Sequence, residues 1–129
     1  IMSYQDNQFL KTFKCNAAVS KYALVKINSS NEVLECALNT DVPMGIAQRG
    51  GAAGDFIEVC LEGPSFALAG AAITLGTHHL LMPTANGKLI PVDTTQANTN
   101  YSVAQFIHNE TAADNDEVLV YYRGASIQG

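Results

Sequence analysis

Apolar and polar residues alternate along several short stretches of the chain, a pattern typical of half-buried β-strands. In the stretch DFIEVCLEG (55–63), Ile57, Val59 and Leu61 fall on one face of an extended backbone, and Glu58 falls on the other. This period of two predicts a strand rather than a helix. The sequence GPS, which begins at the last residue of the stretch, predicts where the strand ends.

Turn sequences separate the other apolar runs. NSSN (28–31) and PTANG (83–87) are rich in residues that favour hairpin turns. The run 65–76 contains several alanines but also a central glycine, so we expect at most one short helix in the chain. The further predicted strands cover 22–27, 32–38, 44–48, 78–82, 88–92, 101–107 and 117–124.

A unit of hairpin, short strand and alternating strand occurs twice. Residues 24–35 resemble 80–91, residues 45–48 resemble 102–105, and residues 55–63 resemble 116–124. Because one such unit leaves a face unburied, we expect the two pseudo-repeats, about 19–63 and 75–124, to pack on each other. The predicted fold is all-β, a compact β-barrel or sandwich. It forms a single domain over 15–129, preceded by an extended N-terminal arm over 1–14.

Charge and hydropathy narrow the possible partners. Seven Lys and Arg residues stand against twelve Asp and Glu residues, and the basic residues form no run, so we expect no nucleic-acid partner. The longest apolar stretch, 66–75, is shorter than the roughly 18 residues that span a bilayer, so we expect no membrane segment. Charged residues make up 15% of the chain, which mildly favours a surface covered by protein partners.

Candidate chemistry is sparse. RGGAAGD (49–55) lacks the Lys and the Ser or Thr of a phosphate loop, so it is interpreted as a turn. His78 and His79 are neighbours on a predicted strand and would point to opposite faces. Three cysteines with no CxxC spacing indicate reduced thiols, which fit synthesis in a cytoplasm. We therefore expect no catalytic residues, no cofactor, no metal site and no enzymatic activity.

The last predicted strand is apolar on both faces. Leu119 and Tyr121 occupy its outer face, where the first unit carries Glu58 and Cys60. Two interpretations stay open: internal packing against another segment, or a subunit interface.

Several motifs together resemble a known family. They are Ala17-Ala18-Val19, then Gly45-Ile46-Ala47, then AAGDFIEV (52–59) ending at Gly63. From about Cys15 onward the chain resembles the small capsid cement or decoration proteins of tailed phages.

The resemblance implies a structural virion protein on the outer surface of the capsid, made in the host cytoplasm. It would bind the major capsid protein, often as a homotrimer, and stabilise the head. Under this hypothesis the arm adds to a capsid sheet edge, with Tyr4, Phe9, Leu10 and Phe13 as anchors. The alternatives are another phage structural component, such as a tail or baseplate part, or a β-sandwich module that binds carbohydrate or another small ligand. The lack of tryptophan counts against carbohydrate.

Overall fold

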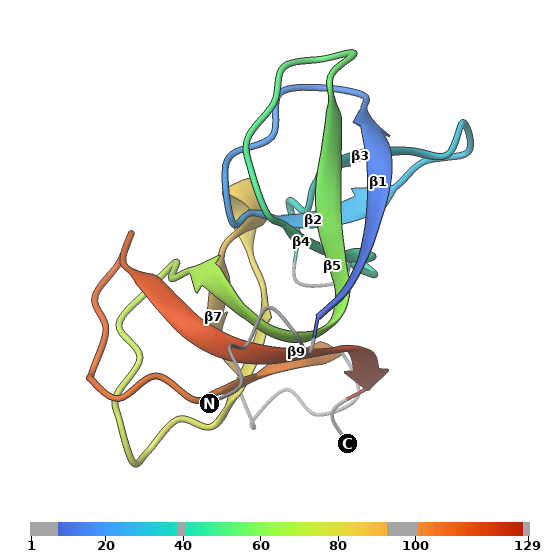
Figure 1. The fold of residues 1–129 in the computed structure, drawn as a ribbon. Coiled ribbons are helices and arrows are strands. Elements are labelled where there is room, and N and C mark those ends of the chain that lie inside the picture. The colour runs from blue at the N-terminus through green and yellow to red at the C-terminus, as the bar shows by residue number, and fades with distance from the viewer. Residues whose placement is uncertain (1–7, 39–40, 93–100, 128–129) are drawn as a thin grey trace.

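The protein is almost entirely β-structure, which confirms the predicted fold class (Figure 1). The computed structural model describes residues 8–38, 41–92 and 101–127. One 3₁₀ turn, η2 (Ala85–Gly87), is the only helical element among them. The strands are β1 (Phe9–Cys15), β2 (Leu24–Ile27), β3 (Glu32–Glu35), β4 (Gly45–Ala47), β5 (Phe56–Leu68), β6 (Leu80–Pro83), β7 (Leu89–Pro91), β8 (Tyr101–Phe106) and β9 (Glu117–Ile127).

The first half of the chain closes into a small barrel. Its strands pair in the order β1-β3-β2-β4-β5, and β1 also pairs with β5, which completes the ring. Its core contains Phe13, Val25, Val33, Ile57 and Val59, each at most 5% exposed. This barrel forms the upper lobe in Figure 1. The first unit therefore buries its own inner face.

The second half closes in the same way. Strands β5, β9, β8, β6 and β7 follow one another in the sheet. A parallel bridge between Ala69 and Leu89 joins the end of β5 to β7 and closes the second ring. The expectation that two open units pack on each other needs revision, because each unit closes on itself. Strand β5 is long enough to serve both: residues 56–62 belong to the first barrel and 63–68 to the second.

Equivalent pairings recur in the two barrels. In the first hairpin Val25 pairs with Glu35, and 56 residues later Leu81 pairs with Pro91. The short strands are offset from the sequence alignment. In the first barrel Ile46 pairs with Cys60, and in the second barrel Tyr121, the counterpart of Cys60, pairs with Gln105. The true counterpart of Ile46 is thus Gln105, two residues beyond the aligned Val103. A two-residue slip keeps side chains on the same face, so the hydrophobic pattern alone does not detect it.

Two predicted boundaries change because the repeat begins earlier in each half. Lys14 pairs with Phe56 as Leu68 pairs with Glu117 in the second barrel. Cys15 likewise pairs with Val33 as Ala69 pairs with Leu89. The segment expected as an extended arm is therefore, from Phe9 onward, a paired strand. Likewise β5 does not end at the GPS sequence; it continues through Pro64, which pairs with Tyr121.

The barrels meet through a shared apolar cluster. Leu24, Cys36 and Ile46 point away from the first core and pack into the second. The turn of the β6–β7 hairpin docks here, with the Gly87 amide donating to the Cys36 carbonyl at 2.8 Å. A Cβ on Gly87 would lie 2.7 Å from the Ala23 Cβ, so only glycine fits this contact.

Candidate functional site

The RGGAAGD stretch forms a turn whose aspartate has a structural task. Asp55 Oδ2 accepts a hydrogen bond from the Ala52 amide at 2.9 Å. Asp116, its counterpart in the second barrel, accepts from the Ala113 amide at 2.8 Å. Two equivalent turns use their aspartates in the same way, which supports the interpretation of this stretch as a fold feature.

The predicted anchors in the N-terminal segment have different positions. Phe9 is 64% exposed and Leu10 is 42% exposed, so both present apolar surface to solvent. Phe13 is only 5% exposed and belongs to the core of the first barrel. An outward contact by Phe13 would require β1 to leave the barrel. Tyr4 lies outside the described residues.

Leu119 and Tyr121 are both half-buried on β9. Leu119 lies opposite Phe66 of β5, and Tyr121 lies opposite Pro64 and Gln105. Leu119 and Phe66 line a shallow hollow of about 360 Å³ together with His108, Asn109 and Glu110. In this hollow His108 Nδ1 accepts the Leu119 amide at 3.1 Å. The structure therefore leaves part of this face open.

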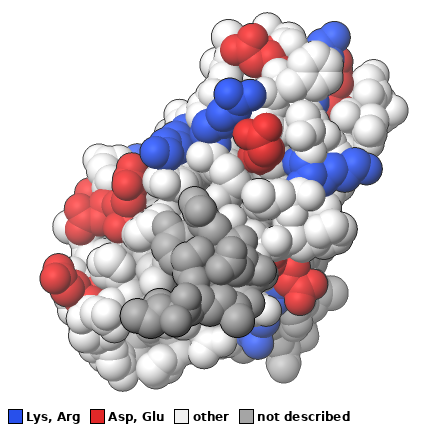
Figure 2. Space-filling view, viewed as in Figure 1, with Lys and Arg blue, Asp and Glu red and all other residues white. Residues whose placement is uncertain are grey.

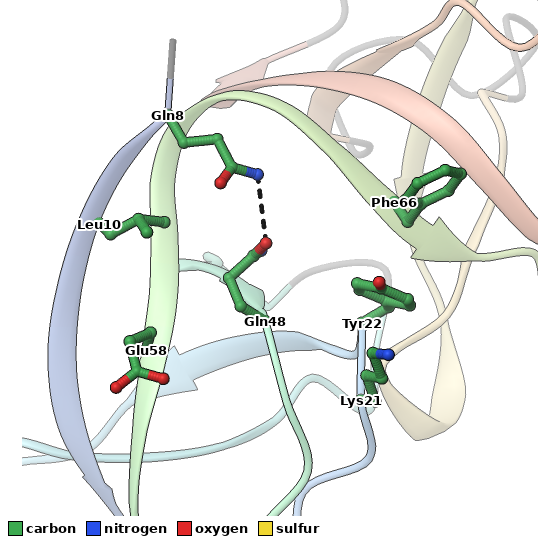
Figure 3. Close-up of a pocket in the computed structure, with 7 residues that line it drawn as sticks. All are labelled: Gln8, Leu10, Lys21, Tyr22, Gln48, Glu58 and Phe66. Atoms are coloured by element: carbon green, nitrogen blue, oxygen red, sulfur yellow. Dashed lines mark hydrogen bonds between the residues drawn. The ribbon is translucent and has the colours of Figure 1, made fainter. Parts of the chain in front are cut away.

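A larger pocket of about 430 Å³ lies where the barrels join (Figure 3). Phe66 lines both hollows, so they adjoin along β5. One wall of the pocket carries Leu10 and Glu58, and the facing wall carries Tyr22 and Phe66 (Figure 3). The described residues that line the pocket are Gln8, Leu10, Lys21, Tyr22, Gln48, Glu58 and Phe66. Among the predicted site residues that the structure describes, only Leu10 lines this pocket.

Two glutamines link the N-terminal segment to the shared strand. Gln8 Nε2 donates to Gln48 Oε1 at 3.1 Å and to the Pro64 carbonyl at 2.8 Å. Gln48 Nε2 donates to Ser65 Oγ at 3.0 Å and to the Ile46 carbonyl at 3.0 Å. Ser65 is fully buried. This network fixes both amide groups at the rim of the pocket.

Tyr22 has an unusual backbone conformation, with φ of 66°. A bulky residue rarely adopts this left-handed region. The Tyr22 amide donates to the Ala47 carbonyl at 2.8 Å, which holds the conformation. Its ring centroid lies 5.6 Å from that of Phe66, and Lys21 Nζ lies 4.9 Å from the Tyr22 ring centroid. Sequence reasoning missed Tyr22, because in YALVKI it reads as the first residue of a strand.

Charged side chains of both signs lie at or near the pocket. Glu58 forms an ion pair with Arg49, with 3.2 Å between Nε and Oε1, and Lys21 contributes a positive charge. Side chains of both signs are scattered over the face shown in Figure 2, and most of its visible described surface is uncharged. Within the described residues, no group of three or more His, Cys, Asp or Glu side chains is arranged to hold a metal ion. None of the described helical segments is long and apolar enough to cross a membrane.

The three cysteines are buried and unpaired. Burial raises the pKa of Cys36 to about 12 and that of Cys60 to about 11. Burial, followed by the nearby Asp55 carboxylate, also raises the pKa of Cys15. Reactive cysteines depend on a lowered pKa, so these thiols behave as core residues.

Comparison with solved structures finds a similar fold. No protein-family model matches the sequence, and neither does any curated protein. Among solved structures, the N base of the head fiber protein gp8.5 of bacteriophage phi29 superposes with a TM-score of 0.69 at 20% identity. The match covers 95% of this chain and 99% of that one. The two proteins therefore share the same fold over nearly their full compared lengths.

Proposed function

We propose that this protein is a structural component of a tailed-phage virion that binds the outer surface of the head as a decoration protein. The shared fold with a head fiber base, over nearly all of both chains, carries this proposal. The motif resemblance to capsid cement proteins points independently to the same particle. Under the proposal the partner is the major capsid protein, and binding stabilises the assembled shell by mass action.

The exposed end of β1 is the proposed docking surface. Phe9 and Leu10 present apolar side chains at the position where β5 passes from one barrel to the other. Exposed apolar patches of this kind commonly mark protein contacts. Because β1 is paired with β5 and β3, docking uses the outward side chains rather than a detached arm.

We further propose that the protein has no catalytic activity. Several groups that could supply such chemistry serve the fold instead: Asp55 and Asp116 hold turns, and the three cysteines are buried. A homotrimer is the proposed solution state. Light scattering on the purified chain will report three times the chain mass if this state forms, and the single chain mass if it does not.

Co-sedimentation with purified heads tests the docking surface. We expect the wild-type chain to pellet with DNA-filled heads of the phage that encodes it. Phe9→Asp should weaken binding by about tenfold or more, since a charge would be desolvated in an apolar contact. Phe56→Asp is the matched control: Phe56 is 59% exposed and lies at the opposite end of the β1–β5 pair.

The outcomes separate the alternatives. Binding to purified tails but not to heads would replace the head proposal with a tail or baseplate role. If Phe56→Asp abolishes head binding and Phe9→Asp does not, the protein binds heads through the far tip of the first barrel. Binding to neither particle would reject the virion proposal altogether.

A further inference from the structure

Three apolar side chains form a row across the outer face of the second barrel. Phe66 of β5 pairs with Leu119 of β9, and the amide of Ile107, which follows β8, donates to the Leu119 carbonyl at 3.1 Å. Ile107 is 38% exposed, and Phe66 and Leu119 are half-buried. These three residues, called the apolar row below, present apolar surface on the outside of the molecule.

The first barrel has a counterpart for each position of the apolar row, and all three counterparts are polar. Thr12 of β1 pairs with Glu58 of β5, and the Gln48 amide donates to the Glu58 carbonyl at 2.9 Å. These contacts repeat those within the apolar row. The same fold is thus built with polar residues at this place, so a barrel does not require the apolar row. Exposed apolar patches on small proteins commonly mark contacts with a partner.

Charges of opposite sign lie close to the apolar row. Phe66 lines both the pocket between the barrels, together with Lys21, and the adjoining shallow hollow, together with Glu110 (Figure 3). Both charged residues are exposed, and neither has an ion-pair partner among the residues that the structure describes. Glu58 in the pocket is paired with Arg49, so Lys21 leaves the pocket positive. One surface therefore combines a positive pocket with a hollow that carries a carboxylate.

We propose that this surface is the interface between copies of the chain, with Lys21 of one copy facing Glu110 of the next. In a closed ring each copy offers the pocket to one neighbour and the hollow to the other, so opposite charges meet at every contact. Burial of the apolar row supplies the attraction, and the charges fix the register. This inference rests on the homotrimer proposed above and names the surface that closes it. Phe9, proposed to contact the head, lines neither the pocket nor the hollow.

Charge reversal tests the register of this interface. Light scattering over a dilution series of the full chain gives the concentration at which half of the trimer dissociates. Lys21→Glu and Glu110→Lys, each alone, should raise this concentration about fivefold or more, because each sets like charges against each other. The double variant restores opposite charges and should return to within about twofold of wild type. Both side chains are exposed, so the changes should leave thermal unfolding of the chain unaltered.

A substitution in the apolar row tests the source of the attraction. Ile107→Asp should raise the dissociation concentration about tenfold or more, because a charge would be desolvated in an apolar contact. Phe56→Asp is the matched control, since Phe56 is also exposed but lies at the far tip of the first barrel. It should dissociate as wild type does. Thermal unfolding of both variants confirms that each still folds.

The outcomes distinguish this interface from the functions on which it rests. If the wild-type chain is trimeric and these variants dissociate as it does, or if the double variant is no better than the single ones, the interface is overturned and the trimer stands. If the wild-type chain is monomeric, the interface and the trimer both fail, whereas co-sedimentation with heads still tests the decoration role. A monomeric chain that loses head binding through Ile107→Asp would assign the apolar row to the capsid contact instead.

Discussion

Single backbone positions determine the turns of both barrels. Gly54 and Asn115 precede the aspartates of equivalent turns, and both have positive φ, at 92° and 74°. The sequence shows a glycine in only one of them. Asparagine adopts the left-handed region more readily than other side-chain-bearing residues, so it serves in place of glycine. A turn can thus recur without its glycine, and a glycine-rich sequence is no evidence of a ligand loop here.

This equivalence predicts the order of two substitutions at one site. A Cβ at Gly54 would have no neighbour within 4 Å, so backbone strain alone decides the cost. Gly54→Ala should lower the free energy of unfolding by about 1 kcal/mol, and Gly54→Asn should cost clearly less. Urea denaturation measures both. Equal costs for the two variants would show that the turn does not select for left-handed geometry.

Buried thiols predict a loss of stability at alkaline pH. The pKa values of Cys36 and Cys60 rise from 9.0 to about 12 and about 11 in the folded protein. Burial also raises the pKa of Tyr122, whose hydroxyl is buried without a hydrogen-bond partner. At pH values below their pKa values in the unfolded chain, all three groups are protonated in both the folded and the unfolded protein, so they add no pH dependence to stability. Above about pH 9 the unfolded chain ionises first, and stability falls as pH rises.

Denaturation series between pH 7 and pH 10.5 check this expectation. Cys36→Ala should flatten the alkaline decline relative to wild type, even though it also creates a small cavity. An unchanged slope in that variant would assign the decline to other groups. Thiol labelling at neutral pH should likewise be slow until the protein unfolds.

At the scale of elements, β1 is part of the barrel rather than an appendage. Phe13→Ala should cost about 3–5 kcal/mol of stability, because the ring is buried in the first core. Phe9→Ala, on the same strand but exposed, should change stability by no more than about 0.5 kcal/mol. Thermal unfolding compares the two. Similar small effects for both would mean that the segment is an arm after all, and deletion of 2–14 would then be harmless to the fold.

The elements also show what the sequence could reveal. The two hairpins and the alternating strand at 57–61 follow from period-two patterns and from turn chemistry, and the structure contains all of them. The continuation of β5 through Pro64 was not predictable, because proline usually ends a strand. Gly63, with φ of 118°, turns the backbone there, and the strand continues into the second barrel. The pocket was missed for a related reason: Tyr22 and Phe66 meet only because the barrels are joined in this way.

At the scale of the whole molecule, the two barrels depend on each other. They share β5, and Leu24, Cys36 and Ile46 of the first unit complete the core of the second. The β6–β7 turn is in addition bonded to Cys36. Opening either barrel would expose apolar surface belonging to the other. The molecule should therefore unfold as one cooperative unit rather than as two domains.

A matched pair of core substitutions tests this coupling. Ile57 lies in the first core and Ile73 in the second, and each is at most 1% exposed. Each Ile→Ala change should cost about 2–5 kcal/mol. If the barrels are coupled, either variant will speed the slowest amide exchange at Val25 and at Leu81 by similar factors, because both amides then exchange through the same global opening. If Ile57→Ala speeds exchange only at Val25 and Ile73→Ala only at Leu81, the barrels open independently. In that case the pocket between them would be a hinge rather than a fixed site.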